Sequence, residues 1–243
     1  HGAIAVGVPE HVANAIYDEI YDFANYAFNK AHAVSYAVVA YQTAYFKCHY
    51  PREYMAALLT SVLDSQEKVA EYIAECKDNG IALLPPDINE SGDVFTVSGN
   101  NIRFGLAAVK NIGRGLIRSV VARRNEGGPF RSLEDFLTRM GEGELNKRAV
   151  ENFIKCGAMD CFGNHRSELL AVYDSMMDSV ASTRKHNLDG QMGLFGMMEE
   201  DAASAIPIPK LPELKKADMM AMEKETTGIY LSGHPMDDYR KYL

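Results

Sequence analysis

The sequence contains no tryptophan, and its four cysteines include no C-x-x-C pair. Neither a zinc knuckle nor a disulfide framework is therefore indicated, and we expect reduced thiols in a cytoplasmic protein. Long apolar runs are also missing. The least charged stretch, residues 31–46, still carries His32, Ser35, Gln42 and Thr43, and it is shorter than the ~20 apolar residues that a bilayer requires. The sequence predicts a buried helix there and no membrane partner.

Positive charge is not in excess. The 243 residues include 33 acidic and 25 basic side chains, and the net charge of −8 argues against indiscriminate coating of nucleic acid or anionic membranes.

Phosphate-loop, zinc-protease and nucleophile-elbow motifs are absent, so no catalytic residue is predicted. His49, His165, His186 and His234 are scattered, so no metal site is predicted. The first residues lack an initiator Met and a signal peptide, so we expect the chain to begin within a longer protein.

Helical spacing of apolar residues dominates the first part of the chain. The predicted helices span residues 10–26, 34–50, 52–63 and 66–78, the last with Ser65 as N-cap and Asn79-Gly80 as its stop. At Ile81 the pattern changes, because Pro85 and Pro86 force extended backbone on the residues before them. We place a domain boundary there.

The second part mixes strand and helix signals. Residues 94–97 and 102–104 alternate around a Ser-Gly-Asn-Asn turn and predict a β-hairpin. Further helices are predicted at residues 106–111, 116–124, 133–140, 147–155, 166–184 and 213–226. The fold class is therefore mainly α, with a helical segment (1–80), a small helical domain containing a β-hairpin (81–186), a Gly- and Pro-rich linker (187–212) and a last helix with an extended end (213–243).

A basic helix–G-x-G–helix element lies in the second domain. Residues 103–124 carry six cations and no acid, so the rest of the chain, whose total is −8, carries −14. Glycines allow close approach to a phosphate, and this charge pattern indicates a directed site for the sugar–phosphate backbone. The predicted DNA-binding residues are Lys110, Gly113, Arg114, Gly115, Arg118, Arg123 and Arg124. The alternative is a helical turn with a solvated basic face. A second hairpin near Gly157 has few cations, and we expect it to be structural.

Two further motifs remain open between alternatives. Asn29, Lys30 and His32 cluster at a predicted helix start, where they could bind an anion or simply cap the helix. Gln191, Met192, Leu194 and Phe195 stand in the linker, flanked by glycines. Such a peptide either fills a partner's groove with its two apolar anchors or packs back on its own domain.

In this order, these motifs resemble the bacterial replicative DNA polymerase III alpha subunits, the C-family polymerases. The resemblance extends over essentially the whole chain. It is most specific at residues 28–47, 86–91, 102–115, 190–195 and 231–235. It implies that residues 1–80 are the later part of the fingers and that 81–186 form a helix-hairpin-helix domain on the primer–template duplex. It also implies that the chain stops before an OB-fold.

The resemblance also implies roles for individual residues. Asn29, Lys30 and His32 would contact the incoming deoxynucleoside triphosphate; Ala31 stands where the family often has Ser. Gln191, Met192, Leu194 and Phe195 would bind the sliding clamp, with other replisome subunits nearby. The palm carboxylates that hold Mg²⁺ would lie upstream of His1, so this chain should bind no cofactor and have no polymerase activity by itself.

Two other functions are compatible with the same residues. One is a non-catalytic helix-hairpin-helix adaptor in DNA repair, which would also bind duplex DNA. The other is a helical scaffold for protein interaction whose basic hairpin has no nucleic-acid partner.

Overall fold

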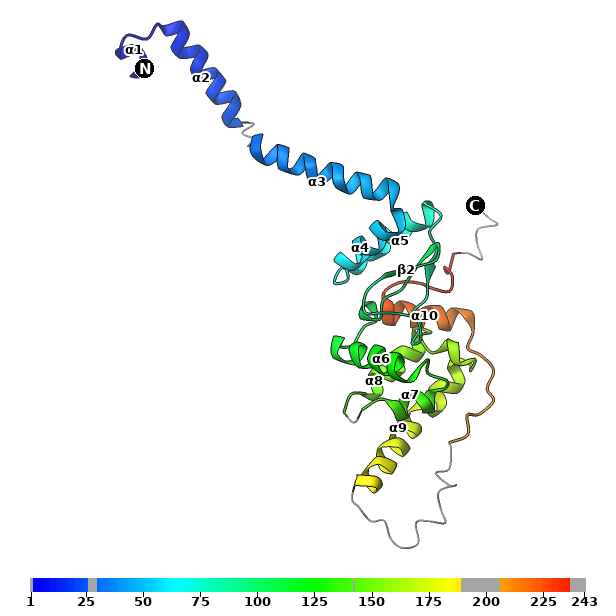
Figure 1. Ribbon diagram of the computed structural model, residues 1–243. Coiled ribbons are helices and arrows are strands. Elements are labelled where there is room, and N and C mark those ends of the chain that lie inside the picture. The colour runs from blue at the N-terminus through cyan, green and yellow to red at the C-terminus, as the bar shows by residue number, and fades with distance from the viewer. Residues whose placement is uncertain (1, 26–29, 142, 189–205, 237–243) are drawn as a thin grey trace, which may run out of the picture. The chain divides into compact units, whose positions relative to one another are not determined.

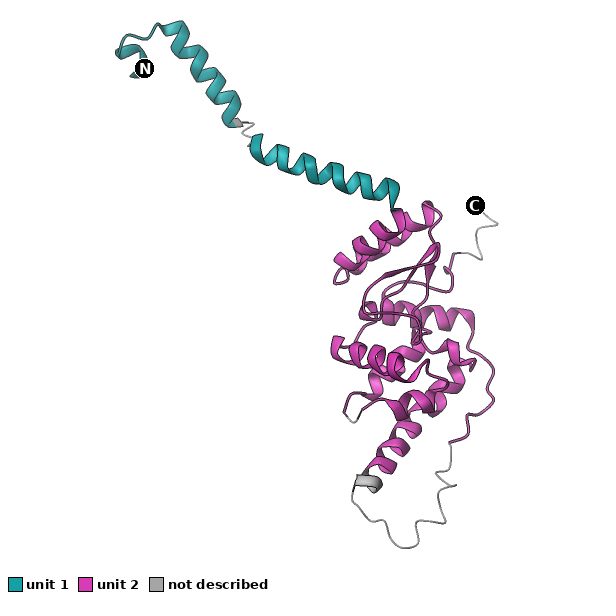
Figure 2. Cartoon of the chain, in the orientation of Figure 1, with its two compact units in different colours: residues 1–50 teal, residues 51–243 magenta. Residues whose placement is uncertain are grey.

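The computed structural model describes residues 2–25, 30–141, 143–188 and 206–236, and the chain forms two compact units, His1–Tyr50 and Pro51–Leu243 (Figure 2). The first unit consists of helices. They are α1 (Gly2–Ala5), α2 (Glu10–Asn25) and α3 (Lys30–His49). Helix α3 begins four residues before the predicted start at Val34, since its first turn contains good helix formers. The predicted burial of this helix is not observed: none of its residues is buried, and Tyr41 is 73% exposed, because no second layer of the unit covers it.

The second unit opens with two helices and a small sheet (Figure 1). These elements are α4 (Pro51–Ser61), α5 (Gln66–Asp78), β1 (Leu83–Leu84), β2 (Thr96–Ser98) and β3 (Asn101–Arg103). The strand order is β1-β3-β2, with β1 parallel and β2 antiparallel to β3. The β2–β3 pair confirms the predicted hairpin, and Gly99, with φ +58°, supplies the left-handed backbone that its tight turn needs.

Helices α4 and α5 share one hydrophobic core with the sheet. Leu59, Ile73, Ile81, Ile102 and Phe104 are all buried in it. The compact units divide after Tyr50, whereas the domain boundary predicted from the sequence lies at Ile81. The reason is that the apolar faces of α4 and α5 must be covered, and the adjacent sheet covers them.

The remainder of the second unit is helical. It comprises η1 (Leu106–Ala108), α6 (Arg114–Gly127), α7 (Leu133–Arg139), α8 (Lys147–Lys155), η2 (Asp160–Phe162), α9 (Arg166–Leu188) and α10 (Lys216–Thr227). Ser132 caps α7 by accepting from the Asp135 amide at 3.1 Å, and Asn146 caps α8 by accepting from the Ala149 amide at 2.8 Å. The predicted helix at 106–111 is only one 3₁₀ turn. The mainly helical fold class with a small sheet is confirmed, and no helix in the described part of the chain is both long and apolar enough to cross a membrane.

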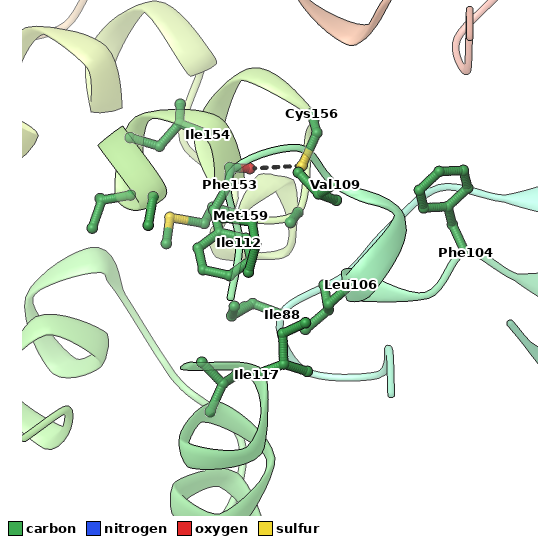
Figure 3. Close-up of a cluster of buried hydrophobic side chains, with 14 of the residues drawn as sticks. Ile88, Phe104, Leu106, Val109, Ile112, Ile117, Phe153, Ile154, Cys156 and Met159 are labelled. Atoms are coloured by element: carbon green, nitrogen blue, oxygen red, sulfur yellow. Dashed lines mark hydrogen bonds between the residues drawn. The ribbon is translucent and has the colours of Figure 1, made fainter. Parts of the chain in front are cut away.

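Figure 3 shows the part of the core that lies under the basic hairpin. Val109 and Ile112 of the hairpin are buried together with Phe153, Ile154 and Met159, which come from α8 and the turn after it. Burial of a large apolar side chain stabilises a fold by roughly 1.5–3 kcal/mol. The hairpin is thus fixed by apolar contacts on both sides of its exposed corner.

Candidate nucleic-acid interface

The corner of the hairpin is made by Lys110 and Asn111, which are exposed between buried Val109 and Ile112. Asn111 has φ +62° and is the one non-glycine residue with positive φ in the described ranges. Asparagine tolerates this left-handed conformation better than most residues. The sequence predicts the tight turn at the two glycines, whereas the structure places it at Asn111.

Gly113 and Gly115 serve a different purpose. Gly113 is the N-cap of α6 in an extended conformation, with φ −74°, and Gly115 lies in the first turn of the helix. A Cβ atom at either glycine would meet no atom of the described protein within 4 Å. Neither backbone conformation nor internal packing therefore demands glycine here. Their small size leaves open space in front of the first turn of α6.

The N-terminus of α6 has no side-chain cap, in contrast to the starts of α7 and α8. The first amide groups of a helix have no intrahelical partner, and the helix dipole makes this end positive. Gly113 and Gly115 allow another molecule to come close to these amides. The arrangement is suited to a phosphate group.

The backbone of Lys110 is held from two sides. Its amide donates to the carbonyl of Thr226 in α10 at 2.8 Å, and its carbonyl accepts from Nδ2 of Asn152 in α8 at 2.8 Å. Asn152 is only 5% exposed. Neither contact is predicted from the sequence; the one local sign is a polar residue beside Phe153 on the buried face of α8.

Arg114 and Arg118 are accessible cations of the site. They lie one turn apart on the same face of α6. Both are exposed, and neither side chain forms a hydrogen bond or ion pair with another residue that the structure describes. Arg123 is also exposed, and its side chain forms a 3.6 Å ion pair with Glu126. These three side chains and Lys110 are available to an anionic ligand.

Arg124 differs from the other predicted DNA-binding residues. Its Nη1 donates to the carbonyls of Ile88 and Ser91, both at 3.0 Å, and burial lowers the pKa of the guanidinium. The side chain therefore fixes the 88–91 loop to α6 and is removed from the candidate DNA surface. Arg103 is engaged in a similar way, with Glu90 and the Pro85 carbonyl.

After the second hairpin, the one near Gly157, the start of α9 already binds a carboxylate of this protein, that of Glu213. Glu213 accepts from the amides of Arg166 at 3.0 Å and Ser167 at 3.4 Å, at the start of α9. Burial alone would raise the pKa of Glu213, but hydrogen bonds from the backbone amides of Leu214, Arg166 and Ser167 hold it below its ordinary value. The start of α9 is therefore occupied, which agrees with the structural role expected for this hairpin.

The other predicted sites are only partly visible. Lys30 and His32 lie together in the first turn of α3, both exposed, and the His32 ring centroid is 4.3 Å from that of Tyr36. Asn29 lies outside the described residues. So do Gln191, Met192, Leu194 and Phe195. Within the described residues, no group of three or more His, Cys, Asp or Glu side chains is placed to hold a metal ion.

Comparison with known proteins agrees with the hairpin geometry. Residues 80–169 match the helix-hairpin-helix motif, so this part of the second unit is similar to that class of DNA-binding element.

The relatives are more specific. DNA polymerase III subunit alpha of Thermus aquaticus is 47% identical over 238 residues, which are 98% of this chain and 19% of that protein. The subunits of Mycobacterium tuberculosis and Vibrio cholerae are 42% and 39% identical, over 97% and 100% of this chain. The sequence corresponds to one segment of the DNA polymerase III alpha subunits, and it spans about a fifth of the length of these relatives.

Proposed function

We propose that this chain is the duplex-binding segment of a replicative, DNA-directed DNA polymerase and that it binds the sugar–phosphate backbone through the start of α6. The observation that carries the proposal is the uncapped helix start, with open space at Gly113 and Gly115 and with Arg114 and Arg118 free of partners among the described residues. The helix-hairpin-helix match and the polymerase relatives support it.

Phosphate contacts of this kind are independent of base sequence. The amides of α6 would bind phosphate oxygens by direct hydrogen bonds, while Arg114 and Arg118 would add charge-assisted ones. Because the rest of the chain is acidic, the duplex would be repelled elsewhere and directed to this surface. Such a contact holds a duplex without selecting a site, as a polymerase that moves along its template requires.

Titration of the chain with a short duplex at several salt concentrations tests the proposal. Four accessible cations, Lys110, Arg114, Arg118 and Arg123, predict a slope of about −3.6 for the logarithm of the binding constant against the logarithm of salt concentration, at about 0.9 per phosphate contact. Duplexes of unrelated sequence should give the same slope. A slope near zero contradicts the proposal.

A repair adaptor with the same motif would also bind duplex DNA. The match to polymerase subunits over nearly the whole chain favours the polymerase segment. Under this proposal the catalytic carboxylates and their Mg²⁺ belong to a palm upstream of His1, and the segment alone does not extend primers. Primer extension by a longer chain that includes the upstream residues distinguishes the two functions.

Two finer roles rest on the family resemblance alone. Asn29, Lys30 and His32 would contact the incoming nucleotide, and the KM for deoxynucleotides of a full polymerase carrying Lys30→Ala tests this role. The peptide with Gln191, Met192, Leu194 and Phe195 would bind the sliding clamp in the cytoplasm among other replisome subunits. Equal retention of wild type and Leu194→Ala/Phe195→Ala on a bacterial clamp contradicts the second role.

A further inference from the structure

We propose that the basic hairpin has a second phosphate site on its other side, formed by Lys110 and Arg148, and that this site takes a further backbone phosphate of the same DNA duplex. The inference rests on the proposed function. Arg148 lies in α8, outside the cation-rich segment of residues 103–124.

The site is a pocket of about 170 Å³ between the hairpin, α8 and the end of α10. Its lining includes Lys110, Asn111, Arg148, Asn152 and Thr226. Two of these lining residues, Asn152 and Thr226, form hydrogen bonds with the Lys110 backbone. The backbone at the pocket edge is thus fixed before any ligand binds, which reduces the entropy lost on binding.

Helix geometry explains why Arg148 reaches this pocket. Arg148 and Asn152 are four residues apart in α8 and therefore lie on the same face of the helix. Asn152 donates to the Lys110 carbonyl, so this face is turned toward the hairpin. Arg148 is exposed, and neither it nor Lys110 forms a side-chain hydrogen bond or ion pair with another described residue.

The charges in the pocket fit a phosphodiester. Three cations and two acids line it. Lys155 is bound by both acids, Glu151 at 2.9 Å and Glu225 at 3.6 Å. Lys155, Glu151 and Glu225 together carry a charge of −1. Lys110 and Arg148 add +2, so the net charge of the pocket is +1. A backbone phosphate carries one negative charge, whereas the phosphates of a free nucleotide carry more and would be less well balanced.

The pocket and the start of α6 are neighbours along the chain. Asn111 lines the pocket, and Gly113, the N-cap of α6, follows it by two residues. A duplex docked at α6 would therefore bring its backbone phosphates close to this pocket. A phosphate group and several waters can enter a space of this size.

Arg148→Gln tests the inference in the same salt titration. Arg148 would add a fifth contact to the four counted above, which brings the expected wild-type slope to about −4.5. The variant should return the slope to about −3.6 and bind duplex about five- to tenfold more weakly at about 0.1 M salt, since one phosphate contact is removed. Arg148→Lys keeps the charge and should recover most of the slope. Lys147→Gln is the matched control, because Lys147 is the next residue but is already paired with Asp174 and Asp178. Its slope should equal that of wild type.

The outcomes separate this inference from the proposed function. If Arg148→Gln binds duplex like wild type while Arg114→Gln loses slope, the second site is refuted and the first stands. If neither variant loses slope, the proposed function fails. If Arg148→Gln weakens binding of a deoxynucleoside triphosphate but not of duplex, the pocket binds free nucleotide and the inference is refuted. A thermal melt of each variant excludes loss of folding as the cause.

Discussion

Replacement of both Arg114 and Arg118 by glutamate is expected to weaken duplex binding by at least about a hundredfold at about 0.1 M salt. Each arginine contributes one phosphate contact worth about eightfold at this salt concentration, and each glutamate adds repulsion of the phosphates. The log–log slope should fall by about 1.8, which is two contacts at about 0.9 each. Both side chains are exposed and make no contact that the described fold needs, so the variant should remain folded.

The control for this experiment must change the net charge equally. Lys215→Glu/Lys216→Glu does so at two exposed lysines at the start of α10. Thr226, whose carbonyl contacts the hairpin, is 10 to 11 residues further along the helix, which is about 15–17 Å at about 1.5 Å per residue. Glutamate is favourable at a helix start, so folding should be preserved. Equal loss of affinity in both double variants would mean that total charge, and not the hairpin, governs binding.

Local sequence signals predicted the elements around the site well. The helices predicted at residues 133–140 and 147–155 are observed as α7 and α8, each directly after a residue type that favours the N-cap, Ser132 and Asn146, and Pro51 occupies the first turn of α4. These features depend on residues within one turn of each other, which is the range at which capping and turn rules act. The basic character of α6 could also be counted directly from the sequence.

Contacts between distant segments could not be predicted in the same way. Arg124 resembles Arg118 in its sequence surroundings, but only Arg124 meets free carbonyls, those of Ile88 and Ser91. The left-handed turn at Asn111 follows Lys110, whose backbone is held by Thr226 and Asn152. Periodicity carries no information on such partners because they are brought together by packing of α8 and α10.

A buried ionic network has no signal in the sequence. Glu223 in α10 is 1% exposed, and its Oε1 lies 3.0 Å from Nη1 of Arg166 in α9. Its Oε2 accepts from the amides of Leu231 at 3.0 Å and Ser232 at 2.9 Å. Arg166 is also bound to Asp160, so the network joins α9, α10 and the segment after α10. By residue type alone, Glu223 is one of several charged residues in a helix with many polar positions.

Glu223→Ala should therefore lower the free energy of unfolding by about 3–5 kcal/mol. Removal of one partner of a buried ion pair leaves the other charge without full compensation. Here it also removes the acceptor of the part-buried hydrogen bonds from the Leu231 and Ser232 amides, which is a further cost. Urea unfolding of the whole chain, followed by circular dichroism, measures the change.

Glu225→Ala is the matched control, two residues away in the same helix. The Glu225 side chain is 65% exposed, and its only ion pair in the described part of the chain is the 3.6 Å contact with Lys155. Exposed pairs contribute about 0–1 kcal/mol, so this variant should unfold close to wild type. Because Thr226 follows in α10 and its carbonyl holds Lys110, Glu223→Ala should also weaken duplex binding under conditions where the chain is still folded. Unfolding curves of Glu223→Ala that coincide with those of Glu225→Ala would show that the buried network does not hold α10 in place.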